Sequence, residues 1–166
     1  MIVAISGTPA TGKTTIANLV GKRLGWKVIE LNRLAHEKGL FSGYDEERHT
    51  QVVDIGKVQK AVDSIFVPDM IIESHYAHDL RCDMVVILRA NPADIRKRAA
   101  DKGWPKKKTE ENVLAEIMEV CKHEALDSGR KVFEVDTTGK TPAKVATEVV
   151  RLIKKLKRIQ DKGSGS

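Results

Sequence analysis

The chain has 166 residues, of which 41% are hydrophobic and 31% are charged, and its formal net charge is +6. This length and composition predict one soluble globular domain with a substantial core, and no apolar run approaches the roughly 20 residues that a membrane-spanning helix needs. Because no basic and then apolar leader precedes the first predicted strand, we expect no signal peptide, no membrane partner and a cytoplasmic location.

The first predicted strand leads into a glycine-rich loop. Residues 1–5 are apolar and largely β-branched, as in a buried strand. Residues 7–14, GTPATGKT, fit the phosphate-loop pattern G-x-x-x-x-G-K-[ST] without a mismatch. Apolar residues then recur at helical spacing over residues 16–24. The loop therefore lies between a strand and a helix, which is the context that the pattern requires.

The residue types of this loop predict nucleotide binding. Gly7 and Gly12 let the backbone approach a ligand closely, and consecutive N–H groups at a helix N-terminus bind anions. Lys13 should reach the β- and γ-phosphates of ATP, and the Thr14 hydroxyl should bind Mg²⁺ directly. The expected ATP-binding residues of this segment are Gly7, Pro9, Ala10, Thr11, Gly12, Lys13, Thr14 and Thr15.

Further along the chain, short apolar runs alternate with helical patterns. We expect the first helix to end at Gly25, a second strand at 28–29, and a short helix capped by Asn32 and closed by Gly39. Residues 41–51 read as a polar loop with an acidic cluster at 45–47, either a solvated loop or a binding element. Asp54 should cap the next helix, which Pro68 ends, and a third strand should finish at Glu73-Ser74-His75.

The second half of the chain continues the alternation. Residues 84–88 are apolar throughout, as expected for a central parallel strand, and Asn91-Pro92 should begin the next helix. Residues 104–108 read as a basic loop, and a helix opening at Thr109 should present Val113, Leu114, Ile117 and Cys121 on one face. A fifth strand at 132–135 and a last helix beginning at 141–142 complete the pattern. Neither cysteine, Cys82 or Cys121, has C-x-x-C spacing, so both are expected to be reduced core residues.

This order predicts an α/β fold, a five-stranded parallel sheet with helices on both faces, with ligands beyond the carboxyl ends of the strands. We expect residues 1–162 to form a single domain. The final Gly163-Ser164-Gly165-Ser166 has the composition of a flexible linker.

A phosphate loop does not identify the phosphoryl acceptor. The base-reading N-K-x-D pattern of G proteins is absent, and Gly139-Lys140-Thr141 lacks the first glycine of a second loop. Kinases of small substrates also need a carboxylate near Mg²⁺, an acceptor site and a basic lid. Glu73, residues 30–65, and Arg98 with residues 104–108 are placed to supply these parts.

With these parts assembled, the chain resembles the adenylate kinase isoenzyme 6 family of small nucleoside monophosphate kinases, which also act as ATPases in small ribosomal subunit maturation. The resemblance runs nearly end to end. It rests on the loop, on the acidic segment 43–47 followed by Val53-Asp54, on Glu73-Ser74-His75, on Leu88-Arg89, and on Arg98 followed by Gly103-Trp104. The family usually has aspartate where this chain has Glu73, and we expect the longer carboxylate to keep its role.

The resemblance implies that residues 1–162 form a single P-loop kinase domain, with a monophosphate-binding part at about 30–65 and a short lid at about 98–110. It also implies roles for individual residues. Lys13, Glu73, His75 and Arg98 would be catalytic, with Glu73 contacting Mg²⁺ through water and His75 positioning water or the acceptor. Arg98, Thr138 and Gly139 would join the ATP site. Arg33, Asp54 and His75 would bind the monophosphate. A strand-end histidine such as His75 is otherwise often only a hydrogen-bonded structural residue.

The resemblance also implies partners, and three functions stay open. The chain could transfer phosphate from ATP to AMP, or act as a ribosome assembly ATPase that binds a small-subunit ribosomal protein, or phosphorylate another small acceptor such as shikimate or cytidylate. The acidic residues 45–47 could attract a basic ribosomal protein. The basic residues of the last helix could contact ribosomal RNA or could simply be a solvated face.

Overall fold

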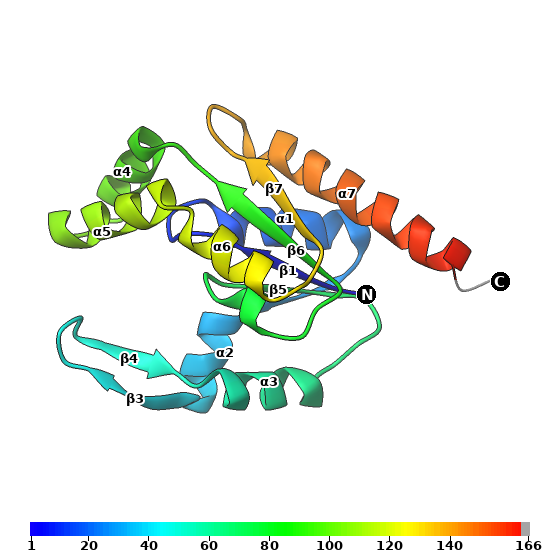
Figure 1. The fold of residues 1–166 in the computed structure, drawn as a ribbon, viewed down its shortest axis with the longest axis horizontal. Coiled ribbons are helices and arrows are strands. Elements are labelled where there is room, and N and C mark those ends of the chain that lie inside the picture. The colour runs from blue at the N-terminus through cyan, green and yellow to red at the C-terminus, as the bar shows by residue number, and fades with distance from the viewer. Residues whose placement is uncertain (164–166) are drawn as a thin grey trace.

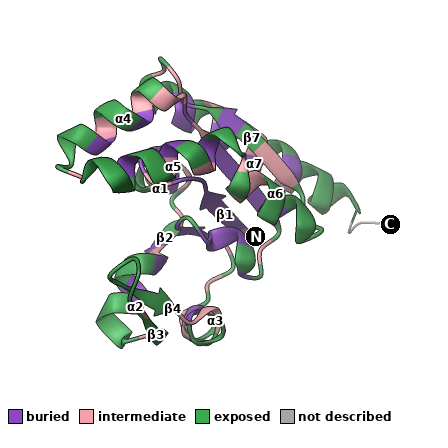
Figure 2. Ribbon diagram, turned by 60° about the vertical axis from the view of Figure 1, so that its left-hand side comes forward, coloured by how far each residue is buried: buried purple, intermediate pink, exposed green. Residues whose placement is uncertain are grey.

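The computed structural model describes residues 1–163 and has a five-stranded parallel sheet at its centre. The strands are β1 (Ile2–Ser6), β2 (Lys27–Glu30), β5 (Met70–Glu73), β6 (Met84–Arg89) and β7 (Val132–Asp136), in the spatial order β2-β5-β1-β6-β7 (Figure 1). β1 pairs with β5 and β6, and these central strands are almost wholly buried (Figure 2). The predicted fold class and the predicted strand at 84–88 are confirmed.

Helices cover both faces of the sheet. On one face, α1 (Lys13–Leu24) and α7 (Pro142–Gly163) pack through a buried cluster that includes Ile16, Val149 and Ile153. On the other face lie α2 (Leu31–Lys38), α3 (Ile55–Ser64), the short 3₁₀ helix η1 (Ala77–Asp79) and α6 (Val120–Asp127). None of the helices in the described part of the chain is both long enough and apolar enough to span a membrane.

An arm of two helices, α4 (Pro92–Asp101) and α5 (Lys106–Ile117), projects at the carboxyl end of the sheet (Figure 1). Ile95 of α4 and Val113 of α5 pack with Ala10 of the glycine-rich loop, and Trp104 packs against this cluster between the two helices. The expected lid therefore has a small core of its own that includes the loop.

Several predicted helix ends are confirmed. Gly25 and Gly39 adopt left-handed conformations directly after α1 and α2. The Asp54 side chain accepts a hydrogen bond from the Lys57 N–H at the start of α3, and Asn91 does the same for Asp94 at the start of α4.

The prediction of a polar loop at 41–51 is wrong, because this segment forms a β-hairpin of β3 (Phe41–Asp45) and β4 (Thr50–Val53). Its residues are exposed or only half-buried, and the two strands pair only with each other. A hairpin without a buried face lacks the apolar alternation by which a strand is recognised in a sequence.

The expected course of residues 104–121 is also corrected. α5 begins at Lys106, so Lys106, Lys107 and Lys108 form its first turn instead of a loop, and Thr109 does not open the helix. The helix ends at Ile117, and Glu119 has a φ of 54° before α6 begins. Leu114 and Ile117 point to solvent with 57% and 60% of their area exposed, although Val113 is buried as expected.

Three smaller boundaries differ from expectation. α2 begins at Leu31 directly after β2, so Asn32 lies inside the helix and is not its cap. Leu31 is fully buried, which holds the first helical residue against the core. α3 ends at Ser64, before Pro68, and Gly163 is the last residue of α7. The rest of the expected linker, residues 164–166, lies outside the described residues.

Candidate active site

The glycine-rich loop joins β1 to α1 and is fixed by close backbone packing. At Gly7, with a φ of 143°, an added Cβ would lie 2.6 Å from the Leu88 carbonyl oxygen, so a side chain cannot fit there. Gly12 has a φ of 91°, and Ala10 has a φ of 71°, which is unfavourable for a residue with a side chain. The loop therefore holds a strained, open backbone at the N-terminus of α1, as a phosphate site requires.

Lys13 lies across this loop. Its Nζ donates a hydrogen bond to the Thr8 carbonyl at 3.1 Å. Burial lowers the pKa of Lys13 to about 8, although the nearby Glu73 carboxylate opposes this shift. The ammonium is thus held in surroundings where its charge is poorly solvated, and a bound phosphate would supply the missing negative charge.

Thr14 and Glu73 meet at the ends of α1 and β5. The Thr14 Oγ1 donates a hydrogen bond to the Glu73 Oε1 at 2.9 Å. Burial raises the pKa of Glu73, against the opposing effects of the Thr14 hydrogen bond and of the charges on Lys13 and Lys102. A hydroxyl and a carboxylate are hard oxygen ligands that suit Mg²⁺ when phosphate oxygens and water complete the coordination.

No group of three or more His, Cys, Asp or Glu side chains within residues 1–163 could hold a metal ion by itself. In proteins, Mg²⁺ is usually bound by few protein ligands together with substrate phosphates.

His75 follows β5 by two residues, and its side chain is exposed to solvent. The surrounding protein nevertheless lowers the pKa of His75 to about 4, first through desolvation and then through the charges of Lys13 and His78. Its ring lies edge-on to Tyr76, with 5.0 Å between centroids. The imidazole is therefore neutral near pH 7, and it lies close enough to Lys13 for that charge to affect its pKa.

Arg98 connects the arm to the loop. Its Nη1 donates to the Ala10 carbonyl at 3.1 Å and to the Thr137 Oγ1 at 3.3 Å. The segment that follows β7 lies close by, since the Thr138 Oγ1 accepts a hydrogen bond from the Asn91 N–H and Gly139 turns the chain with a φ of 65°. Loop residue Ala10, Arg98 and the 137–139 segment are thus brought together from three distant parts of the sequence.

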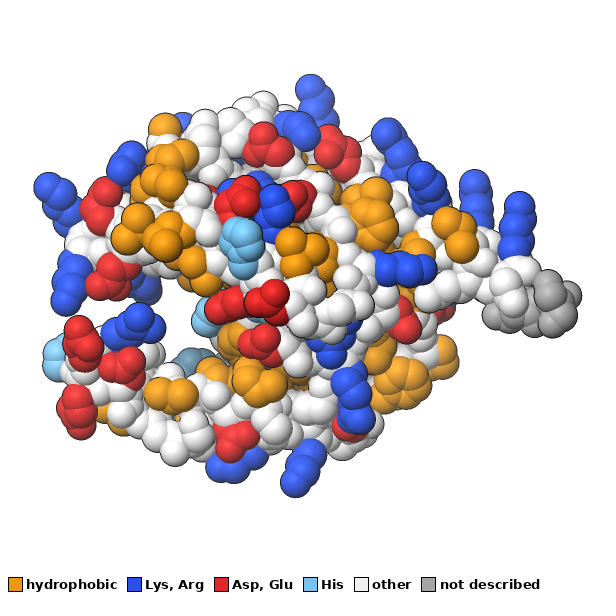
Figure 3. Space-filling model, in the orientation of Figure 1, with side chains coloured by type: hydrophobic (Ala, Val, Ile, Leu, Met, Phe, Trp, Pro, Cys, Tyr) orange, Lys and Arg blue, Asp and Glu red, His pale blue; other side chains and the backbone are white. Residues whose placement is uncertain are grey.

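Of the predicted monophosphate residues, only His75 lies near this group, and Arg33 and Asp54 do not. Arg33 lies on the exposed side of α2 and pairs with Glu37 at 2.8 Å. Asp54 caps α3 and also faces Lys57 at 3.8 Å. Both belong to the part of the molecule that is formed by α2, the β3–β4 hairpin and α3, at the bottom of Figure 1. Figure 3 shows an open notch between that part and the α4–α5 arm. Their role in binding a monophosphate stays a prediction.

Two charged residues near the loop were missed by sequence reasoning. Lys102, at the end of α4, lies close enough to affect the charge states of both Lys13 and Glu73. Glu116 of α5 is buried and accepts a hydrogen bond from the loop residue Thr8. Lys102 could have been found as one of the lysines around Trp104, but nothing near Glu116 in the sequence marks it.

Both cysteines are free thiols and half-buried, and burial raises the pKa of each to about 11. Cys121 lies beside the site, with its Sγ 3.8 Å from the His75 carbonyl oxygen. A thiol with so high a pKa carries little thiolate and is a poor nucleophile near neutral pH.

The glycine-rich loop, the parallel sheet and the arm over the strand ends define a P-loop kinase fold. A shikimate kinase from Aquifex aeolicus shares this fold over 100% of both chains, with a TM-score of 0.55 and 13% identity. A gluconokinase from Sinorhizobium meliloti shares it over 98% of this chain and 96% of its own, with a TM-score of 0.61 and 12% identity.

Sequence comparison narrows the class. A family model described as "AAA domain" matches residues 3–119. Archaeal proteins named "Putative adenylate kinase" match nearly the whole chain. The protein of Thermococcus kodakarensis is 39% identical over 156 residues, 93% of this chain and 86% of its own. That of Pyrococcus furiosus is 40% identical over 154 residues, 92% and 84% of the two chains. The chain therefore belongs to this P-loop family and, within it, to the adenylate kinase-like proteins.

Proposed function

We propose that the chain is a nucleoside monophosphate kinase of the adenylate kinase isoenzyme 6 type, which transfers the γ-phosphoryl group of ATP to AMP and also hydrolyses ATP. The contact of Thr14 with Glu73 beside Lys13 carries this proposal most directly. It joins a hydroxyl, a carboxylate and an ammonium at the mouth of an anion-binding loop, as phosphoryl transfer requires. The names of the archaeal relatives support the same reaction.

The reaction breaks the bond between the γ-phosphorus and the oxygen that bridges it to the β-phosphate. A phosphate oxygen of AMP forms the new bond, and two ADP molecules result. The backbone N–H groups of the loop and Lys13 would hold the donor phosphates, and Arg98 and Lys102 would face the transferring group from the arm. The neutral His75 would orient the acceptor, or water when ATP is hydrolysed.

Mg²⁺ is the cofactor implied by this chemistry, and the residues present fit it. Thr14 would be a direct ligand and Glu73 a ligand through water. When bound, the cation neutralises phosphate charge during transfer.

The direct test is a panel of acceptors (AMP, CMP, shikimate and gluconate) with ATP and Mg²⁺, beside a reaction without acceptor. We expect ADP formation that depends on AMP and exceeds hydrolysis. Acceptor-independent turnover that a small-subunit ribosomal protein stimulates would favour the assembly ATPase, and preference for another acceptor would assign a different kinase specificity.

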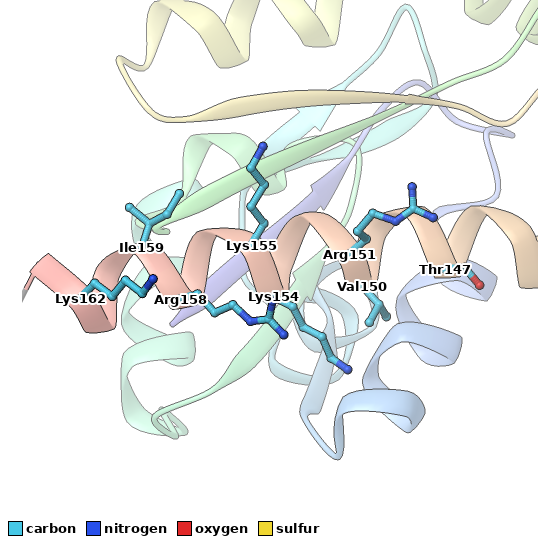
Figure 4. Close-up of a pocket in the computed structure, with 8 residues that line it drawn as sticks. All are labelled: Thr147, Val150, Arg151, Lys154, Lys155, Arg158, Ile159 and Lys162. Atoms are coloured by element: carbon cyan, nitrogen blue, oxygen red, sulfur yellow. The ribbon is translucent and has the colours of Figure 1, made fainter.

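A second candidate function, ribosome assembly in the cytoplasm, is favoured by two charged surfaces. Glu46 and Glu47 are exposed at the tip of the β3–β4 hairpin, where they could attract a basic ribosomal protein. On α7, exposed basic side chains form a stripe that projects from the helix (Figure 4), and none of them forms an ion pair within residues 1–163. The stripe consists of Arg151, Lys154, Lys155, Arg158 and Lys162.

The stripe suits ribosomal RNA better than a membrane, because the apolar face of α7 is buried against the sheet and cannot enter lipid. The test measures binding of a ribosomal RNA fragment by the Lys154→Gln/Arg158→Gln variant. We expect this variant to bind the RNA more weakly than the wild type and with a smaller dependence on salt concentration. Lys60→Gln on α3 is the control and should bind as the wild type does. Equal binding by all three proteins would leave the stripe as a solvated surface.

A further inference from the structure

Glu116 is a buried carboxylate with an unusually complete set of partners. It lies near the end of α5 with 4% of its area exposed. Its Oε2 accepts a hydrogen bond from the Thr8 Oγ1 at 2.6 Å, and its Oε1 accepts from the Arg89 Nε at 2.5 Å and from the Ala90 N–H at 3.2 Å. Burying a charged carboxylate is unfavourable unless such donors compensate it, so this arrangement is a specific one.

Thr8, the residue that Glu116 holds, occupies the second position of the glycine-rich loop and is 1% exposed. Its carbonyl oxygen accepts hydrogen bonds from the Thr11 Oγ1 at 2.8 Å and from the Lys13 Nζ at 3.1 Å. Its neighbour Gly7 packs against the Leu88 carbonyl without space for a side chain. Thr8 is thus fixed at both ends, by Glu116 at its side chain and by the rest of the loop at its carbonyl.

A negative charge this close to a phosphate site would repel a nucleotide unless it were neutralised. Arg89 supplies the opposite charge, and its Nη2 also donates to the Glu116 carbonyl at 3.1 Å. The Arg89 Nη1 pairs in turn with Glu119 at 2.9 Å and with Glu134 at 2.8 Å. Hydrogen bonds and burial therefore tie Glu116 firmly to the end of β6, while its other oxygen faces the loop.

We propose that Glu116 is a positioning residue for nucleotide binding. It touches no phosphate, but it holds the Thr8 hydroxyl and thereby keeps the backbone N–H groups of the loop directed at the phosphate site. It also links the loop to the end of α5, so that this end of the arm and the phosphate loop form one rigid unit. The inference rests on nucleotide binding by the loop, which the proposed function includes, and does not depend on the acceptor.

The test compares Thr8→Val, which keeps the shape of the side chain and removes the hydroxyl, with Thr8→Ser, which keeps the hydroxyl. Calorimetry measures ADP affinity of each protein at 25 °C, and thermal unfolding without nucleotide measures stability. Glu111→Gln is the matched control, because it removes an exposed carboxylate of the same helix.

We expect Thr8→Val to weaken ADP binding about tenfold, the loss of one hydrogen bond to a charged group. The ADP affinities of Thr8→Ser and Glu111→Gln should stay within about twofold of the wild-type affinity. The single variant Glu116→Gln and the double variant Thr8→Val/Glu116→Gln are measured in the same way. If Thr8 and Glu116 act together, the double variant should bind ADP no more weakly than the weaker-binding of the two single variants.

Two results would overturn the positioning role. One is unchanged ADP affinity in Thr8→Val, even with a lower unfolding temperature, since this would leave Glu116 a purely structural residue. The other is an additive loss in the double variant. Failure of the wild-type chain to bind ADP would be a different outcome, because it would overturn the proposed function and the positioning role together.

Discussion

Burial lowers the pKa of the Lys13 ammonium to about 8. A phosphate site needs this lysine protonated, so ADP affinity should fall as the pH rises from 7 through 8. Binding at pH 8.5 should also take up a proton, because the phosphates raise the pKa of the bound lysine. Calorimetry in buffers of different ionisation enthalpy measures that uptake directly.

Lys13→Arg is the control, since arginine stays protonated over this range. Its ADP affinity should be lower overall, because the longer planar group fits the loop poorly, but flat with pH between 7 and 9. A wild-type affinity that does not change between pH 7 and 9 would show that Lys13 is not the group that titrates.

Glu73 lies beside Thr14 but is expected to act on the cation, not on the nucleotide itself. Glu73→Gln keeps the shape and removes the charge, so turnover at low Mg²⁺ should fall by roughly 10–100-fold, the range seen when a metal's supporting ligand is removed. ADP affinity without Mg²⁺ should change little. Titration of ATP turnover with Mg²⁺ checks this, and equal rates at all Mg²⁺ concentrations would make Glu73 only a strand-end residue.

The α4–α5 arm contains residues 98–110, which we expect to act as a lid over the phosphate site. Trp104 packs between its helices, with the Lys108 Nζ 4.2 Å and the Lys102 Nζ 5.3 Å from the centre of its ring. Phosphates bound at the loop should draw these lysines inward and change the surroundings of the indole. We therefore expect ligands to shift Trp104 fluorescence.

The measurement uses the Trp26→Phe variant, in which Trp104 is the sole indole. Trp26 lies at the opposite end of α1, where the Lys157 Nζ is 5.1 Å from its ring. Two adenosines joined by five phosphates should shift the emission more than ATP does, because that analogue fills donor and monophosphate sites together. No shift with either ligand, while calorimetry shows both bound, would mean that the arm does not close.

The anchoring of the arm bears on how it can move. Arg98 contacts the loop from α4 and Glu116 contacts it from α5, so the base of the arm is already attached. Movement of the arm on ligand binding should therefore be confined to the turn around Trp104 and to the first turn of α5, which carries the lysines.

At the scale of the whole molecule, the β3–β4 hairpin and α2–α3 face the arm across an open notch (Figure 3). The base of the hairpin is held to α3, where the Lys57 Nζ donates to the Phe41 carbonyl at 3.0 Å, but its tip is exposed. A ligand that occupies both sites should close the notch. Small-angle X-ray scattering should then show a smaller radius of gyration with the two-adenosine analogue than with ATP.

Lys13→Ala provides the control for this closure, because it removes a phosphate contact without touching the hairpin. That variant should keep the larger radius of gyration at the same ligand concentrations. If the wild-type radius stays unchanged when both sites are saturated, the open notch is the working form of the molecule.

Local patterns in the sequence were enough to predict much of this protein. The strand, loop and helix over residues 1–24, the apolar strand at 84–88 and the caps at Asp54 and Asn91 all depend on residues within a few positions of one another. Backbone conformation and side-chain periodicity act at that range, so the parallel sheet and the position of the phosphate loop could be predicted.

Tertiary structure alone decided the features that depend on distant contacts. The hairpin at 41–53 has no buried face to mark it. Leu114 and Ile117 are exposed because α5 buries the face that carries Val113 and Glu116 instead. Glu116 would look like a surface residue in the sequence, yet Thr8 and Arg89, 108 and 27 positions away, make it a buried acceptor. Such burial becomes favourable only when the fold assembles all the donors around one carboxylate.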